Sequence, residues 1–127
     1  MTNRELAKIA IEMRNQAYAP YSDFQVGAAL LTVDGKLFTG CNVENSSYGL
    51  SICAERTAIC KAVSEGEQVF EKIAVAASPQ ATPCGACRQF IFEFGSQIEV
   101  ICVAADQLDS MRSWTIEELL PNGFRFK

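Results

Sequence analysis

Helical and apolar stretches alternate in the second half of this chain, and this alternation limits the folds that it can adopt. The helical stretches cover residues 53–64 and 83–95, and short apolar stretches cover residues 72–78 and 98–104. Strands that alternate with helices along a chain form a sheet with helices on its faces, and such strands are buried on both sides. The alternation therefore predicts an α/β fold.

The first half of the chain adds a helix and a hairpin to this pattern. Thr2 and Glu5 have the spacing of a capping box, and apolar residues then recur at helical intervals over residues 3–17. Residues 24–33 and 36–43 predict two antiparallel strands joined by a tight turn.

A weak fifth strand over residues 108–114 and a short helix over residues 116–120 end the chain. We therefore expect a three-layer α/β/α sandwich around a five-stranded mixed sheet. A length of 127 residues fits a single domain, residues 1–127.

Charge and hydropathy argue against two classes of partner. The chain has 11 Lys and Arg against 15 Asp and Glu, a net charge of -4, so it offers no basic field to a nucleic-acid backbone. The longest apolar runs fall far short of the ~20 residues that span a bilayer. Charged residues near the N-terminus interrupt the apolar stretch that a secretory signal needs. We expect a cytoplasmic protein that binds neither nucleic acid nor membrane.

Six cysteines and the absence of histidine restrict the chemistry. In a cytosolic chain, cysteines at this density indicate metal binding or catalysis rather than a disulfide scaffold. Without histidine, the Ser-His and Cys-His nucleophile schemes lose their base. Metal binding or acid/base chemistry must then use Cys, Asp, Glu or Lys.

Three of the cysteines stand at predicted helix starts. Cys53 begins one helix, and Cys84 and Cys87 begin the next; Ser51 and Thr82, each two residues before a cysteine, are the expected caps. Free N–H groups and the positive helix end favour thiolates there. Helices that follow successive strands can start side by side at one edge of a sheet, where the three thiolates would converge.

Three thiolates suit an open zinc site, because zinc prefers four ligands and the fourth position is then free for water. Glu55 could carry protons without binding the metal. Residues i and i+2 lie ~200° apart on a helix, so Cys53 and Glu55 must converge beyond the helix tip.

The Cys-x-x-Cys pair is also compatible with a redox dithiol or with a closed structural zinc site. The closed site would need a fourth ligand from Cys41, Cys60 or Cys102. We expect these three cysteines instead to be small buried residues, two in strands and Cys60 on the inward helix face.

Several short motifs of the chain are specific in combination. The first pair is Cys53-Ala54-Glu55 and Pro83-Cys84-Gly85-Ala86-Cys87, which fits a metal ligand-x-Glu followed by Pro-Cys-x-x-Cys. Further motifs are Pro20-Tyr21-Ser22, Val26-Gly27-Ala28, Asn42-Val43-Glu44-Asn45, Ser47-Tyr48-Gly49 and Leu119-Leu120-Pro121. Together they resemble the cytidine and deoxycytidylate deaminase family, in its small, homotetrameric, three-cysteine zinc branch, and the resemblance covers nearly the whole chain.

The resemblance implies a hydrolase that converts cytidine and 2'-deoxycytidine to uridine and 2'-deoxyuridine with release of ammonia, in pyrimidine salvage. One zinc ion per chain would be held by Cys53, Cys84 and Cys87. Glu55 would take a proton from the attacking water, deliver it to the pyrimidine nitrogen, and later protonate the departing amino group.

The resemblance also implies a nucleoside site that is completed across subunits of a homotetramer. Asn42 and Glu44 would hold the ribose, whereas the residues alone indicate only a polar strand face. The other implied substrate-binding residues are Phe24, Ala54, Tyr48 and Phe124, the last two near or from a neighbouring subunit.

Arg56 follows Glu55 directly and could reduce the negative charge of a zinc ion bound by three thiolates, although an exposed helix arginine would look the same in the sequence. Ser46 and Asn122-Gly123 depart from the family's commonest pattern. These departures bear on the range of substrates. A blasticidin-S-type deaminase, which shares the metal and glutamate motifs, or another nucleoside deaminase is the main alternative, whereas the ribose and C-terminal motifs favour cytidine. The negative charge disfavours bases within RNA or DNA.

Overall fold

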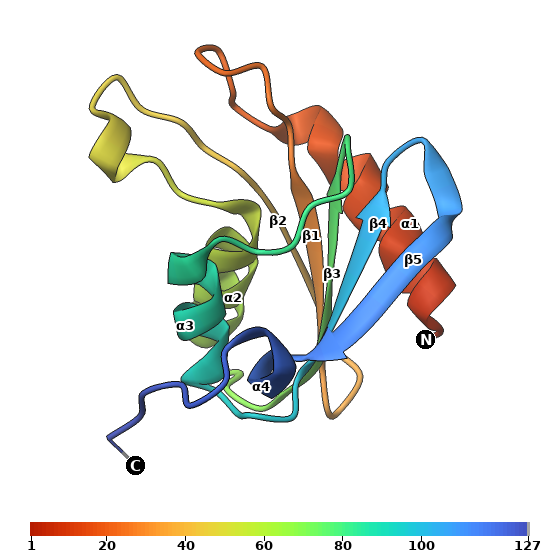
Figure 1. The fold of residues 1–127 in the computed structure, drawn as a ribbon, viewed down its shortest axis with the longest axis vertical. Coiled ribbons are helices and arrows are strands. Elements are labelled where there is room, and N and C mark those ends of the chain that lie inside the picture. Colours follow the sequence, from red (N-terminus) through yellow and green to blue (C-terminus); the bar gives the residue numbers. More distant parts are fainter. Residues whose placement is uncertain (127) are drawn as a thin grey trace.

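Strands β3 (Phe70–Ala77) and β4 (Glu99–Ala104) are apolar on both faces and form the centre of a five-stranded mixed sheet in the computed structural model, which describes residues 1–126 (Figure 1). The other strands are β1 (Gly27–Thr32), β2 (Leu37–Cys41) and β5 (Gln107–Thr115), in the order β2-β1-β3-β4-β5. The β3–β4 pair is parallel and the other neighbours are antiparallel. The predicted mixed sheet is confirmed.

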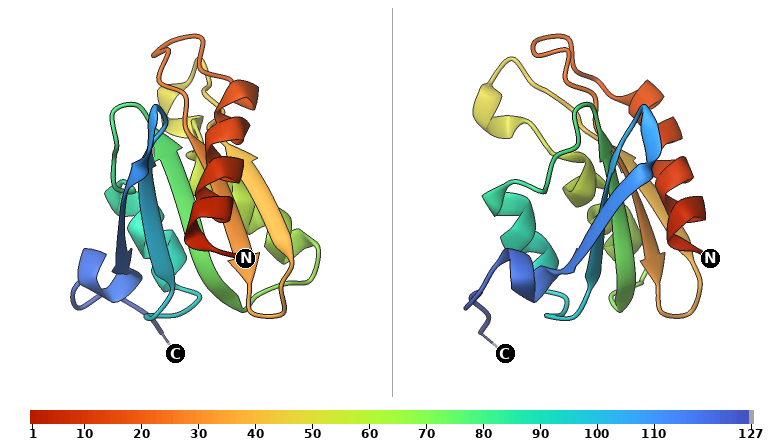
Figure 2. Two further views of the ribbon diagram at one scale, coloured as in Figure 1. Left: turned by 90° about the vertical axis from the view of Figure 1, so that its right-hand side faces the viewer. Right: turned by 45° about the vertical axis from the view of Figure 1, so that its right-hand side comes forward.

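Helices cover both faces of this sheet, which confirms the predicted three layers (Figure 2). Helix α1 (Asn3–Met13) packs on one face, and α2 (Ala54–Ser64), α3 (Gly85–Phe92) and the short α4 (Ile116–Leu119) pack on the other. Within residues 1–126, no helix combines the length and the apolar character needed to cross a bilayer.

The strand β1 shows how the two cores are divided. Its side chains alternate between the faces, as the period of two in a strand requires. Ala28 and Leu30 are buried with the residues of α2 and α3, whereas Ala29 and Leu31 are buried with those of α1. One strand therefore holds both helical layers against the sheet.

Several elements are shorter than predicted. Helix α3 spans Gly85–Phe92 instead of residues 83–95, and β2 spans Leu37–Cys41 instead of residues 36–43. The first helix ends at Met13 and continues only as the 3-10 turn η1 (Arg14–Gln16). The strand predicted over residues 24–33 begins at Gly27, because the Val26 N–H donates to the Asn42 side-chain oxygen (2.9 Å) instead of extending the ladder. The Asn42 amide in turn donates to the Phe24 carbonyl (2.8 Å). A side chain therefore ends the sheet here.

The backbone of helix α1 lies directly against the backbone of β1 at Gly27. A Cβ at this position would lie 1.9 Å from the Ala10 carbonyl oxygen and 2.8 Å from the Arg14 nitrogen. Any larger residue must therefore push the helix away from the sheet.

We expect Gly27→Ala to lower the free energy of unfolding by about 1–3 kcal/mol or more, the usual cost of overpacking. Urea denaturation of the purified variant measures this change. Gly49→Ala is the matched control, because a Cβ there meets nothing within 4 Å. Equal unfolding free energies for the two variants would show that the close approach does not restrict this position.

Candidate functional site

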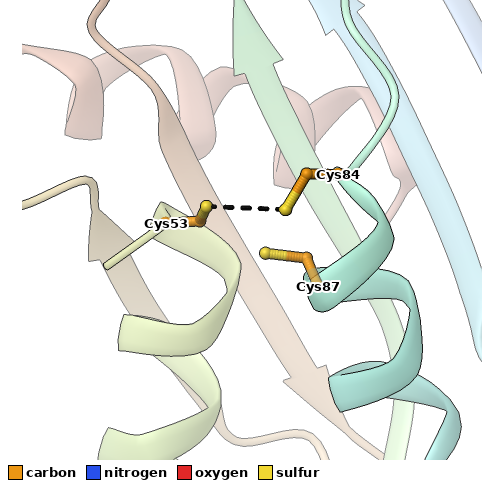
Figure 3. Close-up of side chains that lie close together, drawn as sticks. All are labelled: Cys53, Cys84 and Cys87. Carbon is orange, nitrogen blue, oxygen red and sulfur yellow. Dashed lines mark hydrogen bonds between the residues drawn. The ribbon is translucent and has the colours of Figure 1, made fainter. Parts of the chain in front are cut away.

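Three cysteine side chains meet between the starts of α2 and α3. Cys53 directly precedes α2, Cys84 directly precedes α3, and Cys87 lies in the first turn of α3. Figure 3 shows all three side chains directed toward a common point. Their Sγ atoms lie within 4.8 Å of one another, and those of Cys53 and Cys84 are 3.7 Å apart. Both helix starts lie at the end of the sheet where β3 ends (Figure 1).

The expectation that Ser51 and Thr82 cap these helices is wrong. The N-cap residues are Cys53 and Cys84 themselves, and neither makes a side-chain capping hydrogen bond. The hydroxyl oxygens of Ser51 and Thr82 accept hydrogen bonds from other groups near the loops instead. Two of the sulfurs therefore stand just outside the positive helix ends, where a negative charge is stabilised.

The spacing of the sulfurs fits a tetrahedral metal. With Zn–S bonds of about 2.3 Å, two ligands of a tetrahedral zinc lie about 3.8 Å apart. The distance of 3.7 Å between the Cys53 and Cys84 sulfurs matches this edge. Within residues 1–126, this is the only group of three or more metal-binding side chains that lie close enough together. It has three members, so the fourth coordination position of a tetrahedral metal would stay open.

The thiols differ in acidity. The pKa of Cys53 is lowered to about 5, mainly by a hydrogen bond shared with the Cys87 thiol and also by Arg56. The same hydrogen bond, together with burial, raises the pKa of Cys87. Cys53 thus carries the first negative charge, and a bound zinc ion would remove the remaining thiol protons, since coordination deprotonates thiols.

Arg56 lies against this cluster. Its Nη2 donates to the Cys53 sulfur at 3.5 Å, and this hydrogen bond raises the pKa of the guanidinium. The Arg56 Nε is buried and has no partner within residues 1–126. The arginine predicted to balance the thiolate charge is therefore in direct contact with one of the thiols.

Glu55 is the one buried carboxylate beside the cluster in the part of the chain that the structure describes. It lies in the first turn of α2 and is only 3% exposed. Burial raises its pKa to about 7, and the negative charge of Cys53 acts in the same direction. A carboxyl group with this pKa can accept and release a proton near neutral pH. Cys53 precedes the helix and does not follow its geometry, so it can line the same cavity as Glu55 although the two residues are only two positions apart.

A cavity of about 260 Å³ opens next to Glu55. It brings together most of the residues that the sequence singled out. These are Phe24, Asn42, Glu44, Cys53, Ala54, Glu55 and Cys84. The two remaining candidates for substrate binding lie elsewhere in this chain. Tyr48 is 77% exposed and borders a neighbouring hollow, and Phe124 is 61% exposed and follows α4.

The two polar candidates for sugar binding in the cavity lining, Asn42 and Glu44, are held by the backbone around them. Asn42 is buried and bonded to the segment that carries Phe24. The Glu44 carboxylate accepts hydrogen bonds from the N–H groups of Tyr21 (3.0 Å) and Ser22 (3.2 Å) and from the Ser22 hydroxyl. The Ser22 hydrogen bond lowers the pKa of Glu44. This carboxylate therefore has a fixed place and a fixed charge.

Other cavity residues were not foreseen. They are Val26, Ser51, Ile52, Val75, Ala77, Ala81 and Thr82. The position of Thr82 just before the Cys-x-x-Cys pair was a usable signal, whereas nothing in the sequence marks the small strand residues Val75 and Ala77. The expectation of a buried Cys60 is wrong: the inward face of α2 is formed by Ala58, Ile59 and Ala62, and Cys60 is exposed.

Comparison with known proteins gives a consistent result. The family model described as the cytidine and deoxycytidylate deaminase zinc-binding region matches residues 1–104. A probable cytidine deaminase of Dictyostelium discoideum is 54% identical over 98% of this chain and 86% of that protein. A cytidine deaminase of Halalkalibacterium halodurans is 48% identical over 98% and 95% of the two chains.

Solved structures agree with these relatives. The crystal structure of cytidine deaminase from Burkholderia pseudomallei superposes with a TM-score of 0.92 at 46% identity, over 98% of this chain and 100% of that one. The matched family region contains both helix starts and all three clustered cysteines. With its sheet, its three-cysteine cluster and its buried glutamate, this chain belongs to the cytidine and deoxycytidylate deaminase family and takes zinc as its cofactor.

Proposed function

We propose that this chain catalyses the hydrolytic deamination of cytidine and 2'-deoxycytidine to uridine and 2'-deoxyuridine, with release of ammonia. A cytidine deaminase at 48% identity and a probable cytidine deaminase at 54% identity support this reaction. The observation that carries it is the buried Glu55, with a pKa of about 7, beside three converging thiols in one cavity. The usual role of the reaction is pyrimidine salvage. A single catalytic domain and a cytoplasmic location remain predictions from the sequence.

The three thiols of Cys53, Cys84 and Cys87 hold the metal, and no histidine is available to replace them. When bound, zinc supplies a Lewis acid that makes water a nucleophile near neutral pH. The protein contributes three cysteines at the N-terminal ends of two helices and, beside them, the buried carboxyl group of Glu55.

Glu55 moves the protons of the reaction. Its carboxylate takes a proton from the attacking water and delivers it to the ring nitrogen next to C4. The water oxygen forms a bond to C4. Glu55 then takes the second proton from the new C4 hydroxyl and passes it to the amino group, the C4–N bond breaks, ammonia leaves and C4 becomes a carbonyl. A pKa near 7 suits this alternation, since neither form of the group is strongly favoured.

The nucleoside lies across the mouth of the cavity in this proposal. Phe24 packs on the pyrimidine and Ala54 forms the wall beside Glu55. Asn42 and Glu44 hold the ribose hydroxyls, with Glu44 as a charged acceptor fixed by Ser22. The arrangement favours a substrate that carries a sugar, because a free base would make no use of the remaining hydrogen-bonding capacity of Asn42 and Glu44.

We expect Glu55→Gln to keep its zinc and to lose turnover by about 10²–10⁴-fold, the usual contribution of a proton carrier. Cys87→Ala should lose both zinc and turnover, and Cys60→Ala, which changes an exposed cysteine outside the cluster, should keep both. Zinc per chain and cytidine deamination are measured on the same samples. A Glu55→Gln variant that turns over at the wild-type rate would contradict the proposed role.

We propose that Arg56 offsets the charge of the metal centre, where Zn²⁺ and three thiolates sum to 2 − 3 = −1. Its contact with Cys53 supports this role. Arg56→Gln should lower kcat more than it raises KM, because the nucleophile becomes harder to form. Adding Cys53→His removes one negative charge and should restore part of kcat. Steady-state kinetics of both variants at full zinc occupancy measure these changes. A double variant whose kcat is no higher than that of Arg56→Gln alone would contradict the proposed charge compensation.

We propose a homotetramer whose sites are completed across subunits. Phe124 supports this, because it is largely exposed and does not line the cavity of its own chain within residues 1–126. Its carbonyl accepts a hydrogen bond from the Gln89 side chain (2.8 Å), which fixes the backbone of the C-terminal segment against α3. An exposed aromatic residue held in this way is suited to a neighbouring subunit.

We expect Phe124→Ala to raise KM and to leave zinc in place. Mixing it with Glu55→Gln, under conditions in which subunits exchange, should restore part of the activity through hybrid sites that combine intact Phe124 with intact Glu55. Activity assays and native mass spectrometry follow the rescue and the exchange. Proven exchange without any rescue would mean that Phe124 acts within its own chain.

A further inference from the structure

The segment that leads from β3 to α3 carries much of the site but has little backbone support. Ala81 and Thr82 line the cavity, and Cys84 follows directly. Within residues 1–126, no backbone–backbone hydrogen bond involves residues 78–83. The shape of this segment therefore depends on hydrogen bonds made by side chains, which link it to the neighbouring elements.

The beginning of the segment is anchored at the far edge of the sheet. The Gln80 side-chain amide donates to the carbonyl oxygens of Cys102 (2.9 Å) and Ser110 (2.6 Å), which belong to β4 and β5. This holds the segment at Gln80. It does not reach the residues next to the metal cluster.

Arg88 anchors the other end. It lies one helical turn beyond Cys84, and its side chain folds back over the start of α3. Nε donates to the Pro83 carbonyl (2.8 Å), Nη2 to the Thr82 hydroxyl (2.8 Å) and Nη1 to the Leu119 carbonyl (2.8 Å). The guanidinium therefore joins the segment, α3 and the C-terminal helix α4 through three bonds from one planar group.

These three acceptors are uncharged. Within residues 1–126, no carboxylate lies within ion-pair distance of Arg88. The side chain is therefore used for the directions of its donors, since the planar fork can satisfy several fixed acceptors at once. A lysine at this place would offer one compact ammonium group and could not reproduce the arrangement.

We propose that Arg88 is a positioning residue for the metal centre: it sets the place of Cys84 and of the cavity wall at Thr82, and it couples both to α4. The inference rests on the proposed zinc site. The Pro83 carbonyl belongs to the peptide group that joins Pro83 to Cys84, so its hydrogen bond orients the backbone from which the Cys84 sulfur projects. Metal–ligand distances tolerate only about ±0.2 Å, so a small rotation of this peptide group weakens the site.

The test compares the release of zinc by holoenzyme variants into an excess of a chromogenic chelator. Arg88→Met keeps the apolar stem and removes all three donors, and it should release zinc about 10-fold faster or more, the usual effect of losing a partner behind a metal ligand. Arg88→Lys should fall between this variant and the wild type. In cobalt-substituted protein, the visible absorption bands should shift in the same order, because they report the ligand geometry.

Leu6→Ala is the matched control for stability. Leu6 is fully buried on the opposite face of the sheet, so its truncation weakens the fold without touching the segment. At equal stability, release from Leu6→Ala as fast as from Arg88→Met would overturn the proposal, as would zinc release and cobalt spectra that are the same in Arg88→Met and wild type.

Thr82→Val gives a second, milder test if Arg88→Met does not fold. It removes one of the three acceptors and leaves Arg88 in place. We expect a smaller but measurable acceleration of zinc release, and a wild-type rate would count against the proposal. Wild-type protein that takes up no zinc would overturn the proposed function together with this inference, whereas zinc held equally well by all variants overturns the inference alone.

Discussion

The parallel pairing of β3 with β4 determines where this chain can carry out chemistry. Because these strands run in the same direction, the segment that follows β3 leaves the sheet at one edge and must return through α3. Helix α2 packs on the same face of the sheet as α3, and its start is directed toward the same end of the sheet, where β3 ends (Figure 1). Two positive helix ends therefore meet at one point, and three thiols stand there. The cavity that contains Glu55 lies beside these two helix starts.

The sequence predicted the elements well and their ends less well, for a physical reason. The existence of a strand or helix follows from apolar spacing, which is local. The ends depend on hydrogen bonds from distant side chains. Asn42 ends the hairpin by bonding to Val26, and the hydroxyls of Ser51 and Thr82 are taken by other groups near the loops and do not cap helices. A rule based on neighbouring residues cannot anticipate such partners.

The candidate site divides in the same way. Cysteine spacing and helix starts were enough to predict that three thiols converge, and a carboxylate two residues from the first thiol indicated a proton carrier. The contacts of Arg88 could not be predicted, because two of its acceptors are backbone carbonyls, which the sequence does not distinguish from any others. Tyr48 and Phe124 lie outside the cavity of their own chain, so the fold of one chain cannot assign them a role.

Burial and the negative charge of the cysteine cluster both raise the pKa of Glu55. Without metal, Cys53 carries a thiolate because its pKa is lowered to about 5, while the pKa of Cys87 is raised. With zinc and three thiolates, the formal charge of the centre is also −1. The largest cause of the raised pKa of Glu55 is burial by the surrounding chain, and the charge of Cys53 adds to it. The packing of α2 against the sheet therefore brings this carboxyl group to a pKa at which it can exchange protons near neutral pH.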